Sequence, residues 1–298
     1  MIEREICGVL PVNKPAGMTS HDVVFKIRKL YGTKKVGHTG TLDPDATGLL
    51  IVLIGRAAKA AEYVVAGKKV YRAGLRLGLT TDTEDTTGKT LTESDDIPER
   101  AEVLEAIASF KGESLQVPPM YSALKVGGQK LCDLARKGIT VEREPRPITV
   151  YSISADGDGK DYTMEVACSA GTYIRTLCAD IGAKLGCGGA MSSLFRTETG
   201  GFNVSQAHTL AEIEALSQDE RDALLIPTEN LFAELPSVSL PAFYERLAKN
   251  GAEIYQKKIG AGFTVGALLR VYGGDGFMGI GEVREYEGRS AIKIVKFL

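Results

Sequence analysis

The sequence has few residues of the kinds that build metal centres and disulfide frameworks. Its 298 residues include three histidines and five cysteines, and no two cysteines form a C-x-x-C pair. An odd number of scattered cysteines is typical of reduced thiols. The H-x-E and P-C-x-x-C motifs of zinc deaminases are also absent. We therefore expect a cytoplasmic protein without a bound metal.

The sequence also lacks the segments that direct a chain into or across a membrane. Residues 1–7 do not form a basic start that leads into an apolar run. No apolar stretch approaches the length of about 18 residues that a membrane-spanning helix needs. We expect neither secretion nor membrane insertion.

The sequence has no strong excess of one charge, because it contains 36 Lys and Arg and 38 Asp and Glu residues. A net charge of −2 argues against a protein that is uniformly coated by nucleic acid. The charges are nevertheless segregated along the chain. Residues 14–35 and 125–146 are basic, whereas residues 82–105 are acidic. The two basic segments are therefore candidates for binding a polyanion.

Hydrophobic residues make up 44% of the chain, enough for a sizeable core in one large domain with a small appendage. Strands and helices alternate without a regular β-α-β order, which favours an α+β fold with a mostly antiparallel central sheet flanked by helices. We expect Ser20 to cap the first helix. Strands are predicted at residues 6–12, 49–54, 70–77 and 162–168, and helices at residues 20–31, 57–65, 97–110, 129–137, 173–185 and 210–217.

The predicted secondary structure changes in the last part of the chain. After residue 235 come one short helical pattern, at residues 242–248, and short strand patterns separated by glycines. A G-x-G-x-x-G match at residues 274–279 lacks the helix of a dinucleotide site and reads as a β-turn. We expect two domains, residues 1–235 and a small β-rich module at residues 236–298.

Asp43 lies in the segment with the most unusual composition, residues 37–50, which contains three glycines and leads into an apolar strand. Pro44 restricts the backbone of Asp43 to extended geometry. A carboxylate would thus stand on a stiff support at the edge of a sheet. An Asp-Pro turn without a catalytic role fits the same residues, and Asp45 suits a turn better still.

Arg175 occupies a position that favours an anionic partner. We expect Thr172 to cap a helix and Arg175 to lie in its first turn, where the helix dipole disfavours a cation by roughly 0.3 to 1 kcal/mol. Asp43 is the candidate partner, because a paired guanidinium would orient the carboxylate and favour its charged form. The alternative is an ordinary surface arginine.

The chain resembles a known family. Residues 37–50 are similar to the motif G-H-x-G-x-L-D-P-x-A-x-G-x-L of the bacterial tRNA pseudouridine-55 synthases. Residues 277–283 resemble the small PUA-like RNA-binding domain that closes these enzymes. Further similar segments follow in the family's order at residues 13–20, 69–71, 77–83, 117–125, 171–177 and 194–197.

This resemblance implies an enzyme that isomerises uridine 55 in the T-loop of tRNA by glycosidic cleavage, rotation of the base and reattachment through C5, without a cofactor. Asp43 matches the essential carboxylate, Tyr71 the tyrosine that stacks on the base and is implicated in proton removal, and Arg175 the ion-pair partner. Attack on uracil, attack on C1′ and removal of a sugar proton all stay open for Asp43. A core aromatic is the alternative for Tyr71.

RNA contacts follow from the same resemblance. His38 matches a histidine that stabilises the flipped-out RNA, and Leu194 a residue that packs near the base. Lys14, Lys34, Lys35 and Lys125 lie in the two basic segments and are candidates for phosphate contacts. The second basic segment resembles the mobile thumb of the family. Solvated surface charge is the alternative for both segments.

Other functions remain open at this point. Asp43 could be structural in an RNA-binding or RNA-folding module, or it could work with Asp45 in a glycosidase. A guide-RNA-dependent relative would carry additional terminal segments, and this chain begins almost directly at its core. We therefore expect a monomer that acts on the tRNA T-arm without a guide RNA.

Overall fold

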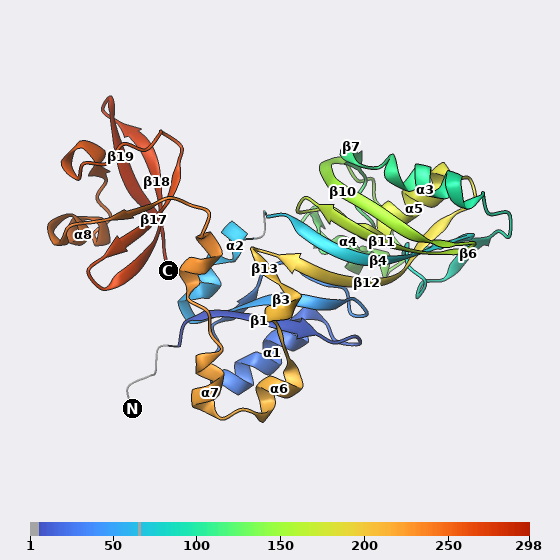
Figure 1. The fold of residues 1–298 in the computed structure, drawn as a ribbon, viewed down its shortest axis with the longest axis horizontal. Helices are drawn as coiled ribbons and strands as arrows, with labels where there is room; N and C mark the ends of the chain where they lie inside the picture. Colours follow the sequence, from blue (N-terminus) through green and yellow to red (C-terminus); the bar gives the residue numbers. More distant parts are fainter. Residues whose placement is uncertain (1–5, 65–66) are drawn as a thin grey trace.

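The computed structural model describes residues 6–64 and 67–298, and its larger part is built on one sheet (Figure 1). Within these residues the sheet comprises β1 (Gly8–Lys14), β2 (Val36–His38), β3 (Thr47–Ile54), β4 (Lys69–Leu77), β7 (Gly112–Gln116), β10 (Arg146–Asp158), β11 (Asp161–Cys168), β12 (Gly189–Thr199), β13 (Phe202–Asn203) and β14 (His208–Thr209). Their order is β14-β1-β3-β12-β4-β11-β10-β7, with β13 beside β12 and β2 beside β3.

Most neighbouring strands in this sheet run antiparallel, and β1 with β14 and β3 with β12 are the parallel pairs among the described residues. The predicted α+β fold with a mostly antiparallel sheet is confirmed. The four predicted strands are present as β1, β3, β4 and β11, with ends that differ by no more than two residues. Gly48, the second residue of β3, has a φ of +96°, and a Cβ there would lie 2.4 Å from the Arg196 carbonyl oxygen. Glycine therefore permits the close approach of β3 to β12.

Helices lie along both halves of the sheet, α1 and α6 near β1 and β3, and α3 and α5 near β10 and β11 (Figure 1). Val23 and Ile27 of α1 pack with Ile213 of α6 in one core cluster, over β1 and β3, while Ile107 of α3 and Leu177 of α5 pack in a second cluster, over β4 and β11. The helices of this part are α1 (Ser20–Tyr31), α2 (Ala61–Val64), α3 (Arg100–Ala108), α4 (Leu131–Ala135), α5 (Ile174–Lys184), α6 (Leu210–Ala215) and α7 (Gln218–Ala223), with the 3₁₀ turns η1 (Gly55–Ala60), η2 (Val204–Gln206) and η3 (Thr228–Phe232).

Two predicted helices differ from the structure. The helix expected at 57–65 begins as the 3₁₀ turn η1 and continues as α2, and residue 65 lies outside the described residues. The helix expected at 129–137 is reduced to α4, because the hairpin β8 (Lys125–Val126) and β9 (Gln129–Lys130) precedes it. Gly127 and Gly128 form the loop of this hairpin with φ of +57° and +83°, and tight two-residue turns favour glycine for that reason.

The predicted cap of α1 was wrong by one residue. Thr19 is the cap: its Oγ1 accepts from Asp22 N at 3.1 Å, and Asp22 Oδ2 accepts from Thr19 N at 2.9 Å. Ser20 instead donates its hydroxyl to Leu42 O at 3.1 Å and accepts from Leu42 N at 2.9 Å. The first turn of α1 is thereby tied to the residue before Asp43.

A second sheet forms the C-terminal part, with strand order β15-β17-β18-β19-β16. Leu269 and Ile292 belong to its own core, and Ile280 packs with Phe232 of η3 at the junction with the main part. The turn expected at residues 274–279 is shorter: residues 274 and 275 connect β17 to β18, and residues 276–279 already belong to β18. The elements are β15 (Ser237–Ser239), α8 (Ala242–Lys249), β16 (Ile254–Tyr255), η4 (Gln256–Lys258), β17 (Leu268–Gly273), β18 (Gly276–Tyr286) and β19 (Arg289–Phe297). The division of function at residue 235 stays a prediction.

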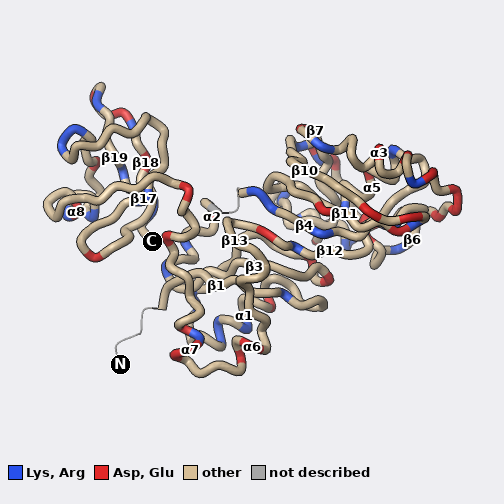
Figure 2. Tube along the Cα trace, in the orientation of Figure 1, with Lys and Arg blue, Asp and Glu red and all other residues tan. Residues whose placement is uncertain are grey.

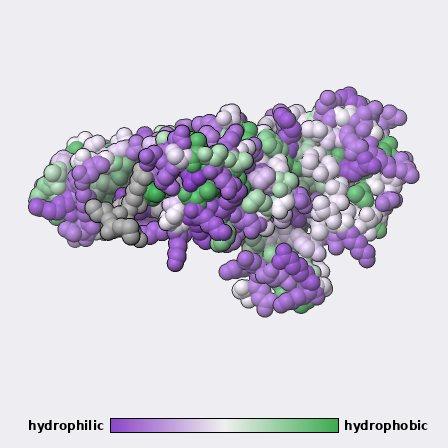
Figure 3. All heavy atoms as spheres, turned by 90° about the horizontal axis from the view of Figure 1, so that it is seen from below, coloured by the Kyte–Doolittle hydropathy of each residue, from purple (hydrophilic) through white to green (hydrophobic). Residues whose placement is uncertain are grey.

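The surface reflects the segregated charges. Acidic residues gather near β6 (Thr90–Glu93), which pairs with β5 (Leu79–Thr81) at one end of the molecule (Figure 2). The face in Figure 3 is largely hydrophilic and shows apolar residues only in small patches. In the described part of the chain, no helix has the length and apolar character needed to cross a membrane.

Candidate active site

Asp43 lies in the connection between β2 and β3, and its neighbours hold this loop on both sides. Leu42 and Ala46 are each 3% exposed and belong to the same core as Tyr71. Lys14 Nζ donates to Pro44 O at 2.8 Å. The loop therefore presents the Asp43 carboxylate from a backbone that is anchored before and after it.

The prediction that Lys14 contacts a phosphate is wrong. Lys14 is completely buried, and its ammonium donates to the carbonyl oxygens of Pro15, Met18 and Pro44. Burial lowers the pKa of Lys14, whereas nearby carboxylates, first among them Asp45, oppose that shift. A buried ammonium needs such acceptors, since an unpaired one is costly. Lys14 positions the Asp43 loop instead of meeting RNA.

The expected ion pair between Arg175 and Asp43 is present. Arg175 Nε lies 3.0 Å from Asp43 Oδ2, and Nη2 lies 3.3 Å from Oδ1, so both carboxylate oxygens face the guanidinium. Two more donors of Arg175 are taken by Thr83 O at 3.1 Å and Tyr121 O at 2.8 Å. With its side chain only 7% exposed, Arg175 is no surface arginine. It fixes the orientation of the carboxylate.

The beginning of α5 is held differently from the prediction. Tyr173, not Thr172, is the cap residue, and its side chain makes no capping bond. Gln116, at the end of β7, takes over this role: its Oε1 accepts from Tyr173 N at 2.8 Å, and its Nε2 donates to Tyr173 O at 3.0 Å. A side chain 57 residues away in sequence thus anchors the turn that carries Arg175.

The surroundings of Asp43 act on its pKa in opposite directions. Burial raises the pKa of the Asp43 carboxyl, and the Arg175 charge counteracts that effect most strongly. Asp85 adds to the increase, and Lys14 opposes it. The net direction is upward, although 41% of the side chain remains exposed. Asp43 therefore has one side bound to Arg175 and another side open to a reactant.

Tyr71 and Leu194 lie on one face of neighbouring strands. Tyr71 of β4 stands opposite Arg196 of β12, and Leu194 stands opposite Ala73 two residues along. Residues directly opposite each other, and those two apart in a strand, point to the same face. Burial raises the pKa of Tyr71, so its hydroxyl is neutral at neutral pH; Arg196 opposes this shift. Tyr71 packs in one core with Leu42, and Leu194 packs against that core.

His38 ends β2, immediately before the Asp43 loop. It is half-buried, and its Nδ1 atom has no hydrogen-bond partner among the described residues. Burial lowers the pKa of the imidazole, and the Arg196 charge lowers it further. The imidazole is therefore neutral at neutral pH, with Nδ1 turned into the protein.

Two residues of the site carried no predicted role. Asp85 Oδ2 lies 3.9 Å from Arg175 Nη1, which makes it a second, more distant carboxylate beside the guanidinium. Arg196 is 1% exposed and donates to Leu49 O at 2.7 Å and Gly40 O at 3.1 Å. In the sequence, Arg196 could have been noticed as a charged residue within an otherwise strand-forming segment. Asp85 lies in an acidic segment, and no sequence feature distinguishes it from its neighbours.

The remaining predicted contacts lie on the surface. Lys34 and Lys35 follow α1, and Lys125 begins β8; all three are exposed. The lysine that supports the Asp43 loop is Lys14. Within the ranges that the structure covers, no group of three or more His, Cys, Asp or Glu side chains could hold a metal ion.

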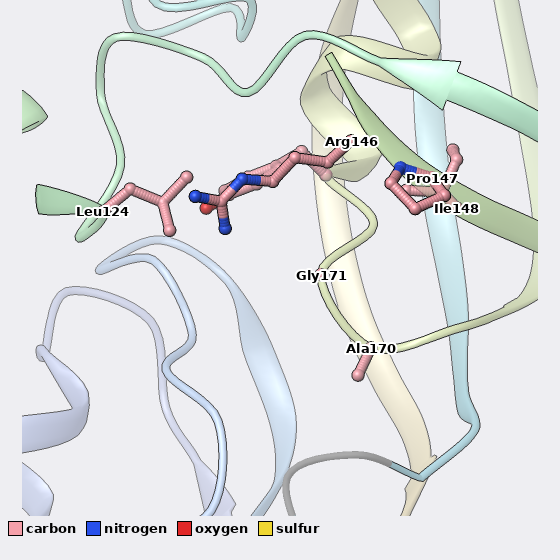
Figure 4. Close-up of a pocket in the computed structure, with 7 residues that line it drawn as sticks. Leu124, Arg146, Pro147, Ile148, Ala170 and Gly171 are labelled. Carbon is pink, nitrogen blue, oxygen red and sulfur yellow. The ribbon is translucent and has the colours of Figure 1, made fainter. Parts of the chain in front are cut away.

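A cavity of about 280 Å³ lies beside the loop that leads to Arg175 (Figure 4). The Arg146 guanidinium reaches across it toward Leu124, and the cavity does not include Asp43 or Tyr71. Its lining consists of Leu124, Arg146, Pro147, Ile148, Ala170, Gly171 and Tyr173. The cavity is therefore adjacent to the arginine side of the site.

Comparison with known proteins identifies the family of this chain. The model of the TruB family pseudouridylate synthase N-terminal domain matches residues 28–174, and that of the tRNA pseudouridylate synthase B C-terminal domain matches residues 175–233. The tRNA pseudouridine synthase B of Clostridium tetani is 44% identical over 98% of this chain and 99% of its own length. The enzyme of the same name from Alkaliphilus oremlandii is 43% identical over 98% of both chains.

A solved structure shows the same architecture. A chain in the crystal structure of a Cbf5-Nop10-Gar1 complex superposes with a TM-score of 0.76 at 27% identity, covering 98% of this chain and 85% of that one. The order of the sequence segments, the sheet and the relatives that match along nearly the whole chain all agree. The chain belongs to the TruB family of pseudouridylate synthases.

Proposed function

We propose that the protein isomerises uridine 55 in the T-loop of tRNA to pseudouridine. Its relatives named tRNA pseudouridine synthase B match over nearly the whole chain. The observation that carries the proposal is the Asp43 carboxylate, which a buried Arg175 binds through both oxygens and whose loop packs on the core of Tyr71. Such a preoriented carboxylate is suited to covalent or proton-transfer chemistry at a sugar or base.

The reaction needs no redox partner and no group donor. The N1–C1′ bond breaks, the uracil turns, and a C5–C1′ bond forms; C5 then loses its proton, and N1 gains one. Asp43 begins this sequence by acting on uracil, on C1′ or on a sugar proton. Tyr71 lies beneath the base, and its neutral hydroxyl is placed for the proton at C5. We expect no cofactor and no metal.

The target base must leave the stack of the RNA before it reaches Asp43, which costs a few kcal/mol. Stacking on Tyr71 would return roughly 1 to 3 kcal/mol of this cost. Leu194, on the same strand face, packs beside the base, and His38 supports the flipped RNA. These side chains together form the site for the extruded nucleotide.

The outer contacts to the tRNA T-arm are assigned to exposed basic residues, namely Lys34, Lys35 and Lys125. The segment between β7 and β10 acts as a thumb, and the C-terminal sheet at residues 236–298 as an RNA-binding domain. The protein works as a monomer in the cytosol, without a guide RNA.

The first test compares Asp43→Asn with Asp45→Asn on an unmodified tRNA transcript. Asparagine keeps the shape of Asp43 but removes its charge, so pseudouridine formation at position 55 should fall by about 10⁴-fold or more. The Kd for tRNA should stay within about threefold, because a single uncharged replacement leaves most contacts intact. Mapping of pseudouridine and filter binding give the two readouts.

Asp45 is the matched control, since it is an exposed aspartate just beyond Pro44. Its asparagine variant should retain near-normal turnover. Near-normal turnover of Asp43→Asn would contradict the assigned role. Binding without modification by the wild type would indicate an RNA-binding module, and release of free uracil would indicate a glycosidase.

A second test uses the pH dependence of the single-turnover rate. The ionised form of Asp43 is the active one, and its pKa is raised, so activity should be lost on acidification at a higher pH than the titration of an ordinary aspartate. Asp85→Asn removes a charge that raises this pKa, and the acid limb should therefore move to lower pH. A limb that stays in place or moves upward in Asp85→Asn would contradict this account, provided circular dichroism shows a folded protein.

A third test addresses the outer contacts. Charge reversal at Lys34 and Lys35 should weaken tRNA binding and reduce the slope of log K against log salt by about 0.7 to 0.9 for each phosphate that is no longer neutralised. Lys111→Glu, an exposed lysine beyond α3, serves as the control and should leave the slope unchanged. An unchanged slope in the Lys34 and Lys35 variant would reassign these residues to plain surface.

A further inference from the structure

Two buried cations near the Asp43 loop have no acidic partner. Lys69 is 8% exposed and Arg196 is 1% exposed. Among the residues that the structure describes, no Asp or Glu forms an ion pair with either. Like charges in a dry environment repel each other strongly. This pair therefore differs from Arg175, whose charge is matched by Asp43.

The two cations converge on Gly40. A Cβ built on Gly40 would lie 3.5 Å from Arg196 Nη1 and 3.6 Å from Lys69 Nζ. Gly40 has a φ of +85°, a conformation that glycine adopts without strain. The residue at this point therefore contributes no side chain, and the loop backbone passes directly beside the lysine ammonium, three residues before Asp43.

Lys69 also points to the same side as Tyr71. It is the first residue of β4 and lies two residues before the tyrosine, so both side chains leave the strand on one face. Arg196 stands directly opposite Tyr71 in β12. Lys69 thus lies one step along the strand from the side chain that would stack on the target base, and Arg196 lies beside that side chain. The start of β4 is basic in Figure 2.

Lys69 differs from the other buried cations of this region in its hydrogen bonds. Arg196 donates to Leu49 O and Gly40 O, and Lys14, the other buried lysine in the loop's support, donates to three carbonyls. The Lys69 ammonium has no acceptor within the described part of the chain. Burial lowers its pKa, and Arg196 lowers it further. Lys69 Nζ is not among the fully buried unpaired atoms of the described residues, so this ammonium reaches solvent and its donors are free for a ligand.

We propose that Lys69, supported by the charge of Arg196, binds a phosphodiester group adjacent to the target nucleotide. The inference rests on the proposed function, because the RNA backbone passes Gly40 only when the base lies over Tyr71. A phosphate would neutralise the unmatched charge, and an ammonium–phosphate bond gains strength where water is scarce. Arg196 is too buried to touch RNA and acts through its field. The phosphate would thereby fix the extruded nucleotide relative to Asp43.

The test measures binding of a T-arm stem-loop RNA by four proteins: wild type, Lys69→Gln, Lys69→Arg and Lys68→Gln. Lys68 is the matched control, an exposed lysine one residue earlier. A second RNA carries uncharged methylphosphonates in place of the phosphates on both sides of the target uridine. Thermal unfolding of each variant verifies that it is folded.

Lys69→Gln should weaken binding of the ordinary RNA by about tenfold to a hundredfold, the range for a hydrogen bond to a charged group. The methylphosphonate RNA should bind wild type more weakly by a similar factor, and Lys69→Gln should add little to that effect. Lys69→Arg should recover most of the affinity, and Lys68→Gln should weaken binding of both RNAs by the same factor.

Equal weakening of both RNAs by Lys69→Gln, or an effect no larger than that of Lys68→Gln, would overturn the phosphate assignment. If Lys69→Gln is unfolded, binding of the two RNAs by Lys69→Arg and by the wild type tests the phosphate assignment instead. Equal binding of both RNAs by the wild type would also overturn the assignment. Pseudouridine formation by wild type is measured on the ordinary RNA as a separate readout. If the wild type forms no pseudouridine, the proposed function is wrong. The binding comparison still tests whether Lys69 binds a phosphate.

Discussion

The ion pair between Arg175 and Asp43 is the interaction on which the site depends. It joins the first turn of α5 to the loop between β2 and β3, two segments that lie 132 residues apart in the chain. A guanidinium placed at the positive end of a helix is unfavourable by itself, so the carboxylate and the carbonyls of Thr83 and Tyr121 compensate for it. The same contacts prevent Arg175 from turning away. The carboxylate thus has its geometry before a substrate arrives.

Other buried polar residues maintain the two sides of this pair. Lys14 and Ser20 hold the Asp43 loop, and Gln116 holds the beginning of α5. Their donors and acceptors are satisfied within the protein, as expected for structural polar groups. The Lys69 ammonium differs because, among the residues that the structure describes, its donors find no acceptor. This contrast separates the residues that build the site from one that is free to bind the RNA.

The sequence alone predicted the elements that depend on local signals. Asp43 before a proline and Arg175 in a first turn suggested an ion pair, and the resemblance to a known family favoured it over an Asp-Pro turn and a surface arginine. Apolar patterns predicted four strands of the main sheet and most helices, but not β7, β10 or β12. Features set by distant residues were missed. The cap of α5 comes from Gln116, and the burial of Lys14 comes from the Asp43 loop that closes over it. A basic segment in sequence therefore contains both structural and exposed lysines.

The claim that Arg175 orients Asp43 is tested most directly by Arg175→Lys, because lysine keeps the positive charge but cannot contact both carboxylate oxygens. The single-turnover rate of pseudouridine formation should fall by about a hundredfold, as expected for a misplaced reacting group. The Kd for tRNA should change little, and circular dichroism should show an unchanged fold. A near-normal rate in the folded variant, or a slower rate explained entirely by weaker tRNA binding, would contradict the account.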